Sequence, residues 1–306
     1  MNKADQLAWE ARLRRPAAYA AIAAAVLGLA SFVVTRTIFE DRPNIGATPD
    51  AFLSINESPD TLIGGTVVGA VSTLLLILVF YFLFRATIHR SPTIPRWFVY
   101  LIFAGPPLYA IAQVIGAFDQ VDVAEQFVNG DYSFEDANAD ESPDLTQCPA
   151  IRGDLGDACA DELARDNRDS PNGAVVFLSL VGPILVAFLF VMLPLRARRA
   201  GLLSPFMGIL GVLSGVLLVL PLLPPVILQA FWLAALGALF LGRWPGGTGP
   251  AWETGEADPW PSPAQRRGLL GPRGKAAADG ADAEPGAPLD PEPPPERPSS
   301  RKRKRK

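Results

Sequence analysis

Six long apolar stretches, nearly free of charge, constrain this 306-residue chain more than any other feature of its sequence. At a rise of ~1.5 Å per residue, a helix of ~20 residues crosses a hydrocarbon layer of ~30 Å. Backbone amides in such a layer must be paired within their own segment, so each stretch is expected to be a helix. We therefore predict an all-α fold, a polytopic membrane protein with about six transmembrane helices. The predicted spans are residues 17–34, 62–84, 97–118, 173–195, 203–220 and 224–242.

The basic residues of the short segments between these spans predict the orientation of the chain. Residues 1–16, the link after the second span, the link after the fourth span and the end of the chain all carry arginine or lysine. Such residues are enriched on the cytoplasmic side of membranes, and six spans place all four segments on one side. We thus expect a cytoplasmic N-terminus, a transmembrane domain over residues 17–242 and a cytoplasmic C-terminus. The first span is longer than the apolar part of a signal peptide, so we expect it to be retained.

Residues 119–172 form an acidic segment, with 15 acidic and 3 basic residues, and are expected to be an outer loop. Val121, Ala124 and Phe127 recur at helical spacing, which predicts a short helix continuing from the third span. Cys148 and Cys159 both lie in this segment, and outside the cell a disulfide between them is the expected state. Free thiols are the alternative. The carboxylates could also bind divalent cations weakly.

The interior of the predicted bundle contains small and uncharged polar residues. Ala17, Ala21 and Ala25 follow one another at four-residue spacing in the first span, as do Gly65 and Gly69 in the second. Such rows let helices approach closely within one bundle, or between the copies of a homo-oligomer. Gln113 in the third span is a candidate cavity-lining residue, although a lone amide more often bonds a neighbouring helix.

The C-terminal segment 243–306 has the composition of a disordered tail, because 22 of the 62 residues from Pro245 onwards are proline or glycine. Two tryptophans within it, Trp252 and Trp260, are expected to contact the membrane surface or a groove on another protein, and the remaining alternative is that they have no role. The tail ends in six basic residues that are expected to contact anionic headgroups: Arg301, Lys302, Arg303, Lys304, Arg305 and Lys306. Insertion in a membrane argues against a specific nucleic acid as the partner of this hexamer.

No sequence motif supplies a catalytic pair, a metal cluster or a phosphate-binding loop, so we predict neither an enzyme nor a bound cofactor or metal. Two classes of function remain. One is a membrane scaffold or accessory subunit that presents its tail and its acidic loop to a membrane or cytoplasmic protein. The alternative is a small-solute permease or channel. The preference for arginine over lysine and the abundance of alanine, glycine and proline favour a bacterial plasma membrane.

Overall fold

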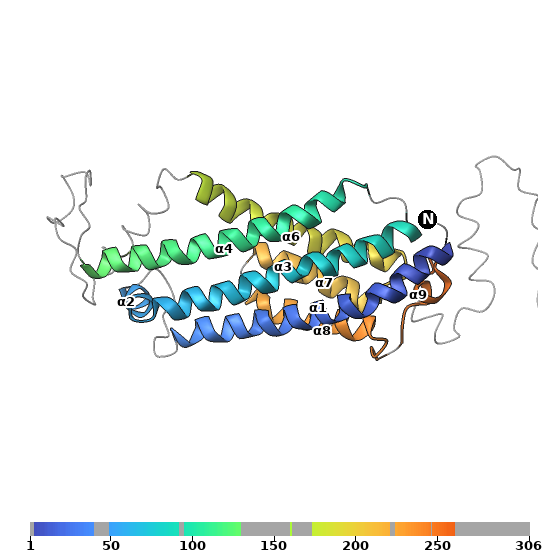
Figure 1. The fold of residues 1–306 in the computed structure, drawn as a ribbon, viewed down its shortest axis with the longest axis horizontal. Coiled ribbons are helices and arrows are strands. Elements are labelled where there is room, and N and C mark those ends of the chain that lie inside the picture. The colour runs from blue at the N-terminus through green and yellow to red at the C-terminus, as the bar shows by residue number, and fades with distance from the viewer. Residues whose placement is uncertain are drawn as a thin grey trace, which may run out of the picture. The chain divides into compact units, whose positions relative to one another are not determined.

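The computed structural model describes residues 3–39, 49–91, 95–129, 160, 173–220, 224–245 and 247–260, and every regular element in these ranges is a helix (Figure 1). The predicted all-α fold is confirmed for this part of the chain. The helices are α1 (Lys3–Thr37), α2 (Pro49–Glu57), α3 (Pro59–Arg90), α4 (Phe98–Asn129), α6 (Gly173–Arg199), α7 (Pro205–Val219), α8 (Pro225–Phe240) and α9 (Pro250–Thr254).

Four helices, α1, α3, α4 and α6, are long and apolar enough to cross a membrane. The apolar helices α7 and α8 are shorter, with 15 and 16 residues, or ~22–24 Å at the usual rise. The prediction of six spans is thus confirmed in part: all six apolar helices are present, but the last two fall short of membrane length. Prolines occupy the first turn of both, where the ring fits the helix and no backbone donor is lost.

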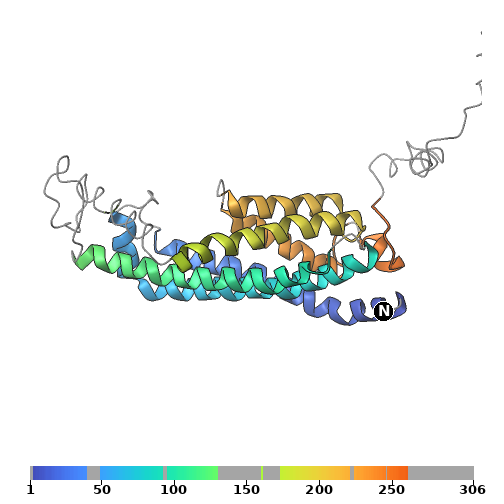
Figure 2. The same ribbon diagram turned by 90° about the horizontal axis from the view of Figure 1, so that it is seen from above.

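The six apolar helices pack in a closed ring. Proceeding along the chain, α1 packs on α3, α3 on α4, α4 on α6, α6 on α7 and α7 on α8, while α8 returns to α1. Figures 1 and 2 show α1, α3 and α4 running side by side, with α7 and α8 beside one half of their length. Apolar helices that pack side by side in this ring also follow one another along the chain. The exception is the pair of α8 and α1, which closes the ring.

The interface of α1 and α3 is built from small residues, as the alanine and glycine rows predict. Ala21 is fully buried, and a Cβ placed on Gly69 would lie 2.7 Å from the Ser31 hydroxyl oxygen. The Ser72 hydroxyl donates a hydrogen bond to the Ala24 carbonyl at 2.7 Å, so the two backbones are in close contact. These rows therefore serve packing within the bundle.

Large apolar side chains cover the outside of the bundle. Val26, Phe177 and Ile227 are 59%, 62% and 55% exposed, respectively. An apolar surface of this kind is rare on proteins that face water. Aromatic side chains fill the inside, where the Trp232 indole is fully buried and donates a hydrogen bond to the Met207 carbonyl at 3.0 Å. The surface and the helix lengths together fit an integral membrane protein.

The two ends of the bundle carry different elements. At one end α2 packs on α4, where the rings of Phe52 and Phe127 are 5.4 Å apart. Helix α4 continues to Asn129, which confirms the predicted helix beyond the third span. At the opposite end lie the start of α1, the end of α3, the turn between α6 and α7, and α9 (Figures 1 and 2). We call this second end the basic end.

The tail differs from the prediction over the residues nearest the bundle. Disorder was expected throughout 243–306, but residues 247–260 form a segment that includes α9 and packs on the basic end. We call residues 247–260 the strap. The mean composition of the tail does not reveal this segment, because the buried Trp252 and the partly buried Trp260 are local features of a polar, proline-rich sequence. Residues 261–306 lie outside the described part of the chain.

Candidate functional site

A buried ion pair between Glu10 and Arg90 lies at the centre of the basic end. The side chains of the two residues are 4% and 0% exposed, respectively. Arg90 Nη1 and Nη2 lie 2.5 and 2.8 Å from the two carboxylate oxygens of Glu10. This two-point geometry is the strongest form of an arginine–carboxylate contact. It joins the first helix to the last residue of α3, since Glu10 lies in α1.

The other polar atoms of the pair also have partners. Arg90 Nε donates to the Ala251 carbonyl at 3.0 Å, and Arg90 Nη1 also donates to the Ala86 carbonyl at 2.8 Å. The Gln6 amide donates to the Glu10 carboxylate at 2.7 Å. A buried ion pair is tolerated only when such additional hydrogen bonds offset its desolvation. The bond to Ala251 makes the strap part of this network.

Trp252 covers the ion pair. Its ring centroid lies 5.5 Å from the guanidinium carbon of Arg90 and 5.6 Å from that of Arg14. The ring stacks on Phe82 at 5.8 Å with an interplanar angle of 10°. Its indole nitrogen donates to the Leu202 carbonyl at 2.9 Å, and the side chain is almost completely buried. Trp252 thus connects the strap to α1, to α3 and to the turn between α6 and α7.

Further contacts hold the rest of the strap. The Trp260 indole donates to the Gly201 carbonyl at 3.0 Å. Gly201 has a φ of 80°, and a Cβ built on it would lie 1.9 Å from the Asp258 carbonyl oxygen. Only glycine satisfies both conditions, because this φ and this close approach each exclude a side chain. The backbone of the strap at Asp258 therefore lies directly against the turn between α6 and α7.

An exposed ion pair closes the network on the N-terminal side. Lys3 Nζ lies 2.8 Å from a carboxylate oxygen of Glu256. The hydrogen bond from Lys3 and the charge of its ammonium group hold the pKa of the Glu256 carboxyl below its usual value. Exposed pairs of this kind contribute little to stability, so the buried contacts of Trp252 and Arg90 dominate.

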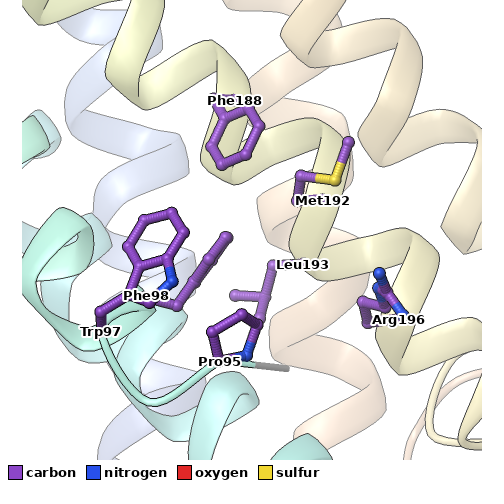
Figure 3. Close-up of a pocket in the computed structure, with 7 residues that line it drawn as sticks. All are labelled: Pro95, Trp97, Phe98, Phe188, Met192, Leu193 and Arg196. Carbon is purple, nitrogen blue, oxygen red and sulfur yellow. The ribbon is translucent and has the colours of Figure 1, made fainter. Parts of the chain in front are cut away.

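Two cavities flank the start of α4 at this end of the bundle. The smaller, of about 180 Å³, lies between α4 and α6 and is shown in Figure 3. It is mainly apolar, with one arginine among its lining residues: Pro95, Trp97, Phe98, Phe188, Met192, Leu193 and Arg196. The larger, of about 570 Å³, lies between α3 and α4 and contains more charge. Neither cavity includes a residue of the Glu10–Arg90 network.

The structure places the predicted site residues in different surroundings. Trp252 and Trp260 bind the chain's own bundle, whereas the prediction gave them a membrane surface or another protein. Gln113 donates to the Thr73 hydroxyl oxygen at 3.1 Å, which is the helix–helix contact expected of a lone amide. A cavity-lining role for Gln113 stays a prediction.

Cys148 and Cys159 lie outside the described residues, and so does the terminal basic hexamer from Arg301 to Lys306.

Glu10 and Arg90 were not among the residues predicted from the sequence. One signal was available, because helical spacing places Gln6 and Glu10 on the same face of α1 as the buried Ala17 and Ala21. Polar residues that continue a buried small-residue face require a buried partner. The identity of that partner was not readable, since Arg90 lies 80 residues away in sequence.

Comparisons with protein-family models, with curated proteins and with solved structures gave no match.

Proposed function

We propose that the protein is a non-catalytic membrane scaffold whose basic end holds the strap as a fixed base for the chain that follows it. The burial of Trp252 against α1, α3 and the turn between α6 and α7 carries this proposal. A tail that only needed an anchor would not require two indole hydrogen bonds to the α6–α7 turn. The contacts fix the position of Trp260, from which residues 261–306 begin.

The proposal includes the orientation of the bundle. The contacts of Arg90 and the strap bring together the N-terminal segment, the end of α3 and the α6–α7 turn. By the positive-inside rule this end faces the cytoplasm. The preference for arginine over lysine and the abundance of alanine, glycine and proline support a bacterial plasma membrane. The helices α7 and α8 are shorter than the hydrocarbon core. They cross it together with the residues that flank them, and the bilayer becomes thinner around them, which gives six crossings in all.

The scaffold is favoured over a permease because the polar group proposed to line a pathway is engaged elsewhere. The Gln113 amide bonds Thr73 between α3 and α4. The polar network of the bundle instead lies at its basic end, where it fastens chain segments to one another. The tail and the acidic loop are the surfaces we assign to partners.

A comparison of three chains tests the scaffold function. The full chain, residues 1–260 alone, and the full chain with Trp252→Ala and Trp260→Ala would be crosslinked in membranes and purified under denaturing conditions. We expect residues 1–260 to insert normally and to lose the crosslinked partner. The tryptophan variant is expected to insert and to recover less partner, because its tail no longer starts from a fixed base. Recovery of the same partner at the same level by residues 1–260 would contradict the proposal.

A further inference from the structure

The larger cavity at the basic end has the composition of a site for an anionic lipid. Its volume is about 570 Å³, and it lies between the end of α3 and the start of α4. The lining consists of two arginines, one histidine and four apolar or aromatic residues, and none of these carries a carboxylate: Tyr81, Phe84, Arg85, Ile88, His89, Arg96 and Val99. A cavity with this lining attracts an anion that also has an apolar part.

The nitrogen-bearing side chains of the cavity come from α3 and from the turn before α4, and all of them line the same space. Arg85 and His89 are one turn apart on α3, and Arg96 stands in the turn that precedes α4. The guanidinium carbon of Arg85 lies 5.3 Å from the centroid of the Trp9 ring, which holds this side chain in position. The neighbouring carboxylate of Glu10 is not part of the lining and forms its two-point ion pair with Arg90.

An apolar surface leads from these basic groups towards the middle of the bundle. Helical spacing places Leu74, Leu78 and Tyr81 on the same face of α3 as Arg85. Leu74 and Leu78 are 42% and 54% exposed. On α4 the ring of Phe103 lies 5.6 Å from that of Tyr81 and is also exposed. From Arg85 to Leu74 the helix rises ~16 Å, about half the thickness of a hydrocarbon core.

We propose that this cavity binds the phosphate of an anionic phospholipid, with Arg85, His89 and Arg96 around the headgroup and an acyl chain along Leu78 and Leu74. Charge selects an anionic headgroup over a zwitterionic one, because the lining contains no carboxylate to bind a choline or ethanolamine cation. The apolar face selects a lipid over free phosphate, which would gain nothing from it. This inference is independent of the scaffold function, since it involves no residue of the strap.

Native mass spectrometry of the detergent-solubilised full chain tests the site, with phosphatidylglycerol and phosphatidylcholine as the two probes. Arg96→Gln and Arg85→Gln are the site variants. Arg199→Gln is the matched control, because Arg199 is an exposed arginine on the last turn of α6, outside the cavity lining. We expect each site variant to weaken phosphatidylglycerol binding about fivefold, the effect of one charge near an anionic surface. The control is expected to bind as the wild type does, and phosphatidylcholine is expected to bind weakly to all.

Arg85→Gln removes a contact with Trp9 and could change packing as well as charge. Arg96→Gln still tests the lipid site in that case, because Arg96 is exposed and lies in a turn, so its substitution changes charge without changing the core. An equal loss of phosphatidylglycerol in Arg96→Gln and Arg199→Gln would show general charge attraction and overturn the proposal. Equal binding of the two lipids would overturn it as well. A third arm adds inorganic phosphate at millimolar concentration. Displacement of the lipid in that arm would assign the cavity to soluble phosphate and reject the lipid.

Discussion

Breaking the Glu10–Arg90 ion pair should destabilise the protein strongly, and the structure gives the size of the effect. Glu10→Met removes two charge-assisted hydrogen bonds from Arg90 and leaves its charge buried. Removing one partner of a buried pair costs about 3–5 kcal/mol. Arg90 retains its bonds to the Ala86 and Ala251 carbonyls, so we expect the lower end, about 3 kcal/mol.

The coupling between the two residues separates this explanation from a general loss of packing. Arg90→Met is expected to cost a similar amount, because it leaves the Glu10 carboxylate buried. The double variant should be no less stable than the worse single variant, since the second substitution removes a group that is already unpaired. This corresponds to a coupling energy of about 3 kcal/mol.

A denaturant titration in mixed micelles, followed by tryptophan fluorescence, measures these changes in the free energy of unfolding. Arg12→Met is the control, because it removes a charge from an exposed position of the same helix and should change stability by less than about 0.5 kcal/mol. Additive losses in the double variant, or a loss of less than about 1 kcal/mol in Glu10→Met, would refute the reasoning.

Three further substitutions test individual contacts. Trp252→Ala should cost about 3 kcal/mol in the same titration, because it empties a buried aromatic site and leaves the Leu202 carbonyl without its donor; a loss below about 1 kcal/mol would contradict the burial. Gly69→Ala should destabilise by about 1–3 kcal/mol because its Cβ meets Ser31, whereas Gly64→Ala, with nothing within 4 Å, should not destabilise; equal effects would count against the α1–α3 interface. Glu256→Gln should make the strap easier to cleave in limited proteolysis at neutral pH, and this difference from wild type should disappear as the pH falls through the lowered pKa of Glu256. A difference that persists in acid would exclude the pair with Lys3 as its cause.

The apolar helices were predictable because the physical signal for each is local. Twenty uncharged residues in succession identify a helix such as α3 without knowledge of the rest of the chain, and the prolines between α7 and α8 mark a turn by the same local rule. The extension of α4 was predictable from its helical periodicity. The exact helix ends were less predictable, because the sequence marks the boundary of a helix only to within one or two residues.

The basic end was not predictable, because its contacts join residues that are far apart in sequence. Arg90 could be recognised only as one of several basic residues in a link, while its partner, Glu10, lay outside the predicted spans. Trp252 was assigned to an external partner since the composition of its surroundings predicts no core. Its ring instead occupies a site made by Phe82, Phe240 and two arginines, which exists only after the bundle has formed.

Crosslinking between the N-terminal segment and the strap tests the central claim most directly. In a chain with Cys148→Ser and Cys159→Ser, Lys3→Cys and Glu256→Cys would be treated in native membranes with a short bismaleimide. The contact between Lys3 and Glu256 predicts rapid crosslinking within one chain. Lys3→Cys paired with Asp50→Cys, in α2 at the opposite end, should give none. If the first pair failed to react, or reacted no faster than the second, the strap would not be held on the basic end.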